Sequence, residues 1–438
     1  MNSGDEASRP VPRVAYARWL DALARAGWSA PPGGPETRRV DLVPVGEALG
    51  RVTTAPVAAR WPSPRASCSA MDGIAVRAAD LAAAPDARDG TDRGAVRLPA
   101  VTFEWIDTGD PMPPDKDTVV VRERLLPQAD GSVIVVAPAG GGQRTGPGAR
   151  GRNVRAVGED FAAGEVLVPA GRRLRPGDLS AIAAGGHVTV TVARRPVVAI
   201  IPTGDEIRPV GSVPRWGDII DTNSLMLAAR CRQLGAEPAV SGVVPDDPDA
   251  LATELRRAAA RADLVLVIAG SSRGRDDHAP AVLAQVGGVA VAGVAIRPGH
   301  PALLGHAKHH TGGHGHPADR AGIAPVIGLP GYPLATAVIF ELFAVPVLGA
   351  ITGQEPARNR VRARLDRDWA SPADVEDWVL VTLASGGQDG VPVATPARRG
   401  AGATSLLARA DAWWPIQAGQ VTFPAGTEIG VFPIPDAS

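Results

Sequence analysis

Three short apolar runs between residues 197 and 348 constrain the fold of this chain more than any other feature. Each run ends in a loop rich in glycine, proline or polar residues, and helix-like patterns lie between or after the runs. The runs are residues 197–201, 264–268 and 326–329, and the helix-like patterns are residues 224–234, 249–262 and 334–343. Continuously apolar strands that alternate with helices are typical of a parallel sheet buried on both faces. The sequence therefore predicts a central α/β domain with a mostly parallel sheet.

The loops after these strands form the predicted ligand site. In sheets of this kind ligands bind beyond the carboxyl ends of the strands, so we expect the three loops to meet at one pocket. The loops at 270–274 and 328–333 lead into helix N-termini, whose unpaired N–H groups and positive dipole ends favour an anion. The basic side chains on or near these loops are Arg273, Arg275, Arg297 and His300.

Carboxylates are concentrated beside the same loops, and several come directly after a strand. They are Asp205, Glu206, Asp218, Asp221, Asp246, Asp247, Asp276 and Asp277. Carboxylates next to a phosphate site indicate a divalent cation such as Mg²⁺ that bridges them, although any single aspartate can instead be a helix cap or a solvated turn residue. The sequence has no Walker-type Gly-Lys-Ser/Thr and no Cys-x-x-Cys pair. The chemistry expected is metal-assisted handling of a phosphate or oxyanion.

Composition argues against several classes of partner. The 438 residues carry 45 basic and 46 acidic side chains, a formal charge of −1, without a long run of one sign, which disfavours nucleic acid and anionic membranes. Two cysteines cannot form a disulfide framework and are typical of a reducing compartment. The N-terminus lacks the apolar segment of a secretory signal, and the most apolar stretch, 326–351, is interrupted by three prolines and Glu341. We expect a soluble, cytoplasmic protein that does not bind a membrane.

The segments that flank the central domain are predicted to be richer in β-structure. Residues 11–28 resemble one helix, residues 51–160 contain short alternating runs of a β-rich domain, and β-structure is expected again from residue 358 to the end. An insertion at 306–322 carries five of the eight histidines, which are His306, His309, His310, His314 and His316. Histidines so spaced can bind a transition metal, and the alternative is an exposed, low-complexity loop.

A set of motifs in order along almost the whole chain resembles the molybdopterin molybdenumtransferases, the family of bacterial MoeA and the gephyrin E domain. In the N-terminal half the motifs are Ser69-Ala70-Met71-Asp72-Gly73-Ile74-Ala75-Val76, Thr108-Gly109-Asp110-Pro111-Met112-Pro113, Asp117-Thr118-Val119-Val120, Asn153-Val154-Arg155 and Gly158-Glu159-Asp160. In the central domain they are Thr203-Gly204-Asp205-Glu206, Asp221-Thr222-Asn223 and Asp246-Asp247-Pro248. An ordered set of this kind is highly specific.

The resemblance implies four domains and a homodimer. The domains are an elongated, discontinuous N-terminal domain (residues 10–50 and 161–194), an inserted β-domain (51–160), a MogA-like three-layer α/β/α domain that binds molybdopterin (195–355) and a C-terminal β-barrel (356–438). The active site of such a dimer lies between the α/β domain of one subunit and the inserted domain of the other. Other proteins of molybdenum cofactor biosynthesis are further implied partners.

The implied reaction is the Mg²⁺-dependent insertion of molybdate into adenylylated molybdopterin, with release of AMP. The implied catalytic residues are Asp72, Glu206, Asp246 and Asp277, and Glu206, Asp246 and Asp277 would also hold the metal. The implied substrate-binding residues are Thr108, Asp160, Thr203, Gly204, Asp205, Gly270, Ser271, Ser272, Gly274, Arg297, His300, Pro330 and Gly331. The 270–274 loop would cradle the phosphate of the pterin.

Three motifs depart from the family pattern and resemble a divergent branch. The family's Gly-Gly-Val-Ser-Val-Gly is Ala269-Gly270-Ser271-Ser272-Arg273-Gly274, its Lys-Pro-Gly-Lys-Pro is Arg297-Pro298-Gly299-His300-Pro301, and its Gly-Asn-Pro is Gly331-Tyr332-Pro333. An arginine and a histidine thus replace the two lysines beside the oxyanion, and a free histidine is largely neutral at pH 7. We expect the oxyanion to bind to Arg297 and Arg273, with a pH-dependent contribution from His300.

Two other functions remain open on the sequence. One is a non-catalytic molybdopterin-binding or scaffold protein, and the other is an adenylyltransferase-like homologue. The retained carboxylates favour the enzyme, because a protein that only binds the pterin has little need of a metal cluster.

Overall fold

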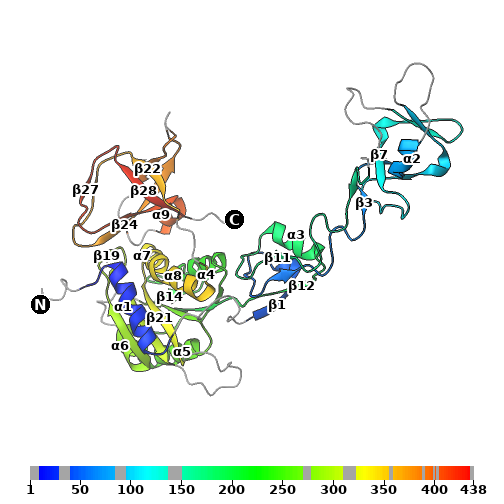
Figure 1. The fold of residues 1–438 in the computed structure, drawn as a ribbon. Helices are drawn as coiled ribbons and strands as arrows, with labels where there is room; N and C mark the ends of the chain where they lie inside the picture. Colours follow the sequence, from blue (N-terminus) through cyan, green and yellow to red (C-terminus); the bar gives the residue numbers. More distant parts are fainter. Residues whose placement is uncertain are drawn as a thin grey trace, which may run out of the picture. The chain divides into compact units, whose positions relative to one another are not determined.

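The structure is a computed structural model that describes residues 9–28, 40–83, 95–136, 150–269, 278–308, 322–354, 359–386, 390–397, 400 and 404–434. The chain divides into two compact units (Figure 1). One unit is Arg39–Ala193, and the other combines Met1–Arg38 with Arg194–Ser438.

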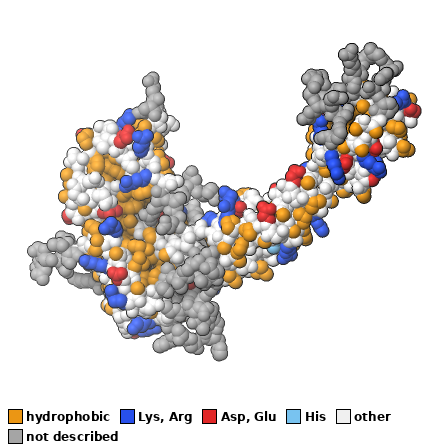
Figure 2. All heavy atoms as spheres, in the orientation of Figure 1, with side chains coloured by type: hydrophobic (Ala, Val, Ile, Leu, Met, Phe, Trp, Pro, Cys, Tyr) orange, Lys and Arg blue, Asp and Glu red, His pale blue; other side chains and the backbone are white. Residues whose placement is uncertain are grey.

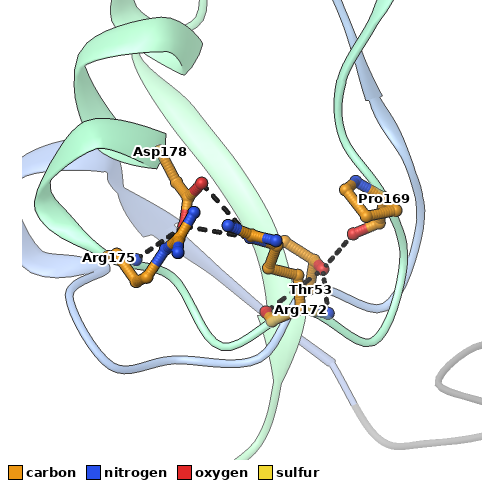
Figure 3. A network of polar contacts seen from close by, with 5 residues as sticks. All are labelled: Thr53, Pro169, Arg172, Arg175 and Asp178. Atoms are coloured by element: carbon orange, nitrogen blue, oxygen red, sulfur yellow. Dashed lines mark hydrogen bonds and ion pairs between the residues drawn. The ribbon is translucent and has the colours of Figure 1, made fainter.

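The unit Arg39–Ala193 is built from small antiparallel sheets. β1 (Val40–Pro44) pairs with β12 (Thr189–Ala193), and β2 (Val57–Ala58) pairs with β11 (Val166–Val168). These strands share a core with the 3₁₀ turn η3 (Val45–Glu47) and with α3 (Pro176–Ala184). Asp178 fastens the first turn of α3, since its carboxylate accepts hydrogen bonds from the Arg175 N–H (2.8 Å) and from Arg172 Nε (3.2 Å) (Figure 3). The Thr53 hydroxyl donates to the Pro169 carbonyl (2.7 Å) and accepts from the Arg172 N–H. Because Arg172 also binds Asp178, one polar network links Thr53 to α3.

The middle of this unit is rich in β-structure, as the sequence predicts. One three-stranded sheet has the order β6-β4-β7 and another has the order β5-β9-β8. Their bounds are β4 (Gly73–Val76), β5 (Val96–Leu98), β6 (Phe103–Ile106), β7 (Thr118–Val121), β8 (Leu125–Pro127) and β9 (Val133–Val135). The other elements are β3 (Cys68–Ser69), which pairs with β10 (Val154–Arg155), the helix α2 (Ala78–Ala83), and the 3₁₀ turns η4 (Ala100–Thr102) and η5 (Arg122–Arg124). Ile74, Leu98 and Val135 belong to the core that the two sheets share.

A six-stranded sheet of order β16-β13-β17-β21-β20-β18 forms the centre of the second unit (Figure 1). Its strands are β13 (Val197–Pro202), β16 (Glu237–Val240), β17 (Leu264–Ala269), β18 (Gly287–Ala292), β20 (Leu303–Lys308) and β21 (Ile323–Pro330). The first four strands in that order are parallel, whereas β20 and β18 are antiparallel to their neighbours. The three predicted apolar runs form the adjacent strands β13, β17 and β21, so the mostly parallel sheet is confirmed.

Helices cover both faces of this sheet. Successive strand residues point to opposite sides, so these apolar strands present a hydrophobic surface on each face. α5 (Pro248–Ala259) and α6 (Ala279–Val286) pack on the face that carries Ile201, Val265 and Val267. The opposite face is covered by α1 (Pro12–Arg25), α4 (Asn223–Gln233) and the helical stretch α7 (Pro333–Ile339), η7 (Phe340–Ala344) and α8 (Val345–Thr352). The three-layer α/β/α arrangement is therefore confirmed.

The helical stretch Pro333–Thr352 is, among the described residues, the one stretch that is long and apolar enough to cross a membrane. Most of it is buried in the core that covers one face of the sheet, as is usual for a core helix of a soluble protein. The stretch is thus accounted for by packing inside this unit.

Helix α1 packs on the α/β sheet, although the sequence placed residues 10–50 in the N-terminal linker domain. Ala15, Trp19 and Leu23 are fully buried at a spacing of four residues, so they form one face of the helix. The indole Nε1 of Trp19 donates a hydrogen bond to the Gly305 carbonyl in β20 (2.8 Å). The limits given for the four domains remain a prediction.

The C-terminal part forms a β-barrel, as predicted. Five strands close on themselves in the order β24-β25-β22-β28-β26, with β26 paired back to β24. They are β22 (Val361–Leu365), β24 (Glu376–Ala384), β25 (Val393–Pro396), β26 (Ala412–Ile416) and β28 (Glu428–Pro433). β19 (Ile296–Arg297), a two-residue strand of the α/β domain, extends this sheet by pairing with the start of β24. β23 (Trp369–Ala370) pairs with β27 (Thr422–Phe423), and the helix α9 (Thr404–Arg409) completes this part.

Candidate functional site

A cavity of about 870 Å³ lies at the carboxyl ends of the parallel strands. Residues of the loops after β13 and β21 line it, together with the last two residues of β17, the N-terminus of α4 and residues 297–301. The C-terminal barrel supplies the remaining wall, which includes Trp369, Asp377 and Trp378. In this unit hydrophobic side chains gather between the barrel and the α/β domain (Figure 2). The sequence predicts a ligand site beyond the carboxyl ends of these strands, and the cavity lies there.

The loop after β13 turns sharply at Gly204 and brings Glu206 to the cavity wall. Gly204 has φ +131°, and a Cβ at this position would lie 2.7 Å from Glu206 Oε2, so only glycine fits there. The Thr203 hydroxyl donates to the Ile268 carbonyl at the end of β17 (2.9 Å). Thr203 and Glu206 line the cavity, and Glu206 is exposed. The carboxylate is therefore available to a ligand.

Asp205 and Asp246 lie side by side on neighbouring loops. Each backbone N–H donates to the carboxylate of the other residue, at 3.2 Å from Asp205 N to Asp246 Oδ2 and 3.3 Å from Asp246 N to Asp205 Oδ1. Both residues are exposed, and neither lines the cavity itself. Across the described ranges, no three His, Cys, Asp or Glu side chains are grouped closely enough to hold a metal ion.

Three other carboxylates of the predicted cluster have structural partners. Asp218 forms an ion pair with Arg208 (2.8 Å). Asp221 accepts a hydrogen bond from the Ser224 N–H at the start of α4 (2.9 Å), and Asp247 accepts one from the Ala250 N–H at the start of α5 (2.7 Å). The helix-cap alternative therefore describes Asp221 and Asp247.

The loop after β21 is tied to the start of α4. Asn223 Nδ2 donates to the Gly331 carbonyl (2.7 Å), and the Thr336 hydroxyl donates to the Pro330 carbonyl. Pro330 and Gly331 line the cavity at this point. The N-terminus of α4, which spans 11 residues, faces the same cavity and adds the positive end of its dipole.

Arg297 and His300 are both exposed and line the cavity. Arg297 is the register partner of Asp377 in the parallel β19–β24 ladder, so the α/β domain and the barrel meet at the cavity wall. Asp377 is only 3% exposed, and its Oδ2 accepts a hydrogen bond from the Ser371 hydroxyl (3.0 Å). The adjacent Glu376 accepts a hydrogen bond from Trp378 Nε1 (2.7 Å), and burial raises the pKa of its carboxyl.

The barrel residues at this wall were missed by the sequence reasoning. The barrel reaches the cavity through the pairing of β24 with β19. β19 comprises two residues, and so short a strand has no periodicity that the sequence could reveal.

Asp72 and Thr108 come together in the unit Arg39–Ala193. Asp72 Oδ1 accepts hydrogen bonds from the Thr108 hydroxyl and from the Thr108 N–H, both at 2.7 Å. These two bonds lower the pKa of the Asp72 carboxyl below its usual value of 3.8. Asp160 lies on another turn of this unit, where its N–H donates to the Ser63 carbonyl (2.9 Å). All three side chains are exposed.

The histidine insertion was predicted to start at His306, but His306 is part of a strand. His306 belongs to β20, where it pairs in register with Gly288 and Pro325, and burial lowers the pKa of its imidazole. The alternation of Leu304, His306 and Lys308 with smaller residues extends the strand past the point that the histidine count suggested. The predicted residues outside the described part are His309, His310, His314 and His316, and also Gly270, Ser271, Ser272, Arg273, Gly274, Arg275, Asp276 and Asp277.

Comparisons with known families cover most of the chain. Residues 15–186 match the MoeA N-terminal region (domain I and II), residues 199–350 match a probable molybdopterin binding domain, and residues 362–434 match the MoeA C-terminal region (domain IV).

Individual proteins are similar over comparable lengths. The molybdopterin molybdenumtransferase of Nostoc sp. is 31% identical over 361 residues, which are 79% of this chain and 78% of that protein. Molybdopterin molybdenumtransferase 2 of Mycobacterium tuberculosis is 32% identical over 347 residues, 75% of this chain and 80% of that protein. A crystal structure of a molybdopterin biosynthesis MoeA protein from Pyrococcus horikoshii aligns with a TM-score of 0.73 at 27% identity, covering 97% of this chain and 99% of that chain. These similarities confirm the resemblance seen in the motifs, and the chain belongs to the MoeA family of molybdopterin molybdenumtransferases, which act in molybdenum cofactor biosynthesis.

Proposed function

We propose that this protein inserts molybdate into adenylylated molybdopterin, with the help of Mg²⁺, and releases AMP. The observation that carries the proposal is the cavity at the carboxyl ends of β13, β17 and β21, because Glu206, Arg297 and His300 all line it. The relatives at 31% and 32% identity are named for molybdenum transfer to molybdopterin, which supports the same reaction here.

The cavity residues divide into anion-binding and acid–base groups. Arg297 stays charged at all working pH values and can bind an oxyanion with two parallel hydrogen bonds. The N-terminus of α4 adds partial positive charge toward the phosphates of the substrate. Glu206 accepts a proton from the water that attacks phosphorus, while the bridging P–O bond breaks and AMP leaves with that oxygen. The freed molybdopterin then receives molybdate at its dithiolene: two Mo–S bonds form, and one molybdate oxygen leaves as water with the two thiol protons.

Mg²⁺ fits the donor chemistry of the loops after β13 and before α5, because carboxylate oxygens are its preferred protein ligands. The carboxylates of Asp205 and Asp246 each accept a hydrogen bond from the backbone N–H of the other residue, and Glu206 follows Asp205 directly. Glu206, Asp246 and Asp277 are the residues that would hold the ion, in line with the family resemblance. When bound, Mg²⁺ neutralises charge that develops on the phosphate oxygens.

The remaining proposed residues belong to the unit Arg39–Ala193. We place Asp72, Thr108 and Asp160 at the active site of the partner subunit in a homodimer, as the family resemblance implies. The hydrogen-bonded pair of Asp72 and Thr108 presents an ionised carboxylate that is available for a substrate or a cation. We propose a cytoplasmic location, where the other proteins of the same biosynthesis are its partners.

The test of the reaction is the release of AMP from adenylylated molybdopterin by the purified protein, with Mg²⁺ and molybdate both present or each left out. We expect turnover only when both are present. Release of AMP without any requirement for molybdate would contradict the transfer reaction, and binding without turnover would instead support the scaffold alternative.

Glu206→Gln is expected to lower the rate by about 100-fold or more, on the scale of losing a general base or a metal ligand. Its fold should be intact, because Glu206 is exposed and lies on a loop. Glu237→Gln is the matched control, since Glu237 is an exposed residue of the edge strand β16 that does not line the cavity. A Glu206→Gln variant as fast as this control would remove Glu206 from the mechanism.

A further inference from the structure

Tyr332 is an exposed aromatic residue at the edge of the cavity. It is 60% exposed, and it lines the cavity together with Gly331 and Pro333. Within the described part of the chain, its ring forms no aromatic pair and its hydroxyl forms no hydrogen bond, so packing inside the subunit does not account for the side chain.

The backbone of Tyr332 is held in place from three directions. Its carbonyl accepts hydrogen bonds from the Thr336 N–H (2.9 Å) and from the Thr336 hydroxyl (3.1 Å) in the first turn of α7. The preceding Gly331 carbonyl is bound by Asn223 Nδ2 from α4, and Pro333 follows with its restricted φ. These contacts fix the backbone of the loop, so the two side-chain torsions of the tyrosine are what binding would have to fix.

The cavity that Tyr332 lines suits a flat, polar ring. Pro298 and Pro301 line the same cavity from the α/β domain, and Trp378 lines it from the barrel. Trp378 is 6% exposed and stacks on Phe432, so its ring is packed within the barrel. Apolar walls with an exposed aromatic face favour offset stacking with a planar heterocycle, and the charged groups Glu206 and Arg297 line the same cavity.

We propose that Tyr332 is a stacking platform for a flat nitrogen heterocycle of the substrate and so contributes to substrate specificity. This inference rests on the proposed function, in which the adenylylated substrate carries two such rings, a pterin and an adenine. Stacking on an aromatic side chain accepts either ring, because both present a π-face.

The experiment compares the wild type with Tyr332→Asn and Tyr332→Phe by calorimetric titration. The ligands are AMP, molybdopterin prepared without oxygen, and ribose 5-phosphate, which keeps the sugar and phosphate of AMP but has no base. We expect Tyr332→Asn to weaken the binding of the stacked ring about 5-fold to 100-fold, the range seen when an aromatic platform under a base is removed. Tyr332→Phe should bind as the wild type does, and ribose 5-phosphate should be bound equally by all three proteins.

The control variant is Trp216→Asn, which removes a fully exposed aromatic residue of the same unit that does not line the cavity. Loss of affinity for AMP alone assigns the platform to adenine, and loss for molybdopterin alone assigns it to the pterin. Equal affinities of Tyr332→Asn and the wild type for both ligands would overturn the role of Tyr332 while the proposed function stands. A wild type that binds neither ring would overturn the proposed function together with this inference, and an equal loss in Trp216→Asn would show that the effect is not specific to the cavity.

Discussion

At the scale of residues, the carboxylates near the loops separate into groups that serve the fold and groups that face a ligand. Asp247 caps α5 and Asp218 pairs with Arg208, so their negative charge is used inside the structure. Asp221 belongs to both groups, because it accepts a hydrogen bond from the Ser224 N–H and also lines the cavity. Glu206 lines the cavity, and Asp72 is exposed and accepts hydrogen bonds from Thr108. Residue type and spacing alone do not distinguish these two groups, because a cap and a ligand both place an aspartate after a strand.

The pair of Asp72 and Thr108 makes a prediction about pH. Hydrogen bonds to the ionised carboxylate lower its pKa, so the pair stabilises the folded state above the ordinary Asp value of 3.8 and loses that effect as the pH falls through the lowered pKa. Thr108→Val removes the hydroxyl and should raise the pKa of Asp72 toward that value, whereas Thr108→Ser should leave it low. Carboxyl ¹³C chemical shifts followed from pH 2 to 6 report the titration. Identical Asp72 curves for the valine and serine variants would show that the hydroxyl does not set this pKa.

At the scale of elements, prolines change the course of helices and strands that the sequence predicts. The helix expected at 334–343 continues to Thr352 through the π turn η7, which ends two residues before Pro346. A proline inside a helix has no N–H to donate and clashes with the preceding turn, so the widened turn accommodates it. The stretch 96–106 in the predicted β-rich segment is likewise divided into β5, the 3₁₀ turn η4 and β6 around Pro99.

Helix α1 makes a prediction about stability at this scale. Trp19 is fully buried, and its indole N–H reaches the Gly305 carbonyl in β20. Trp19→Phe removes the donor and part of the ring volume, which we expect to lower the free energy of unfolding by about 1–3 kcal/mol. Thermal unfolding monitored by circular dichroism measures the change. Trp216→Phe is the control, because Trp216 is fully exposed, and the packing of α1 would be in doubt if both variants melted together.

At the scale of the whole molecule, the proposed site residues lie in two compact units, with Asp72, Thr108 and Asp160 in one and Glu206, Arg297 and His300 in the other. We propose that a homodimer combines them, since the family resemblance implies a site shared by two subunits. An inactive Asp72→Ala protein mixed with an inactive Glu206→Gln protein should then regain partial activity through heterodimers that contain one undamaged site. Activity after subunit exchange and the mass from light scattering test this. A monomeric protein without any recovery of activity would exclude a shared site.

The sequence by itself determined the alternation of strands and helices in the central domain, the β-rich flanks and the position of the candidate site. These features depend on local properties: continuous apolar runs at 197–201, 264–268 and 326–329, and a glycine where the chain must adopt the φ of Gly204. The ordered motifs also determined the family, because each motif is local to a few residues.

Only the tertiary structure decided which distant segments share the cavity wall and the cores. Ile296 and Arg297 form a strand too short to have a pattern, yet their pairing with Glu376 and Asp377 brings the barrel to the cavity. Helix α1 is amphipathic in sequence, but its partner β20 lies 286 residues from Trp19 at the Gly305 contact. Such contacts depend on complementary shapes and on hydrogen-bond donors and acceptors that meet only after the chain has folded, so no local pattern encodes them.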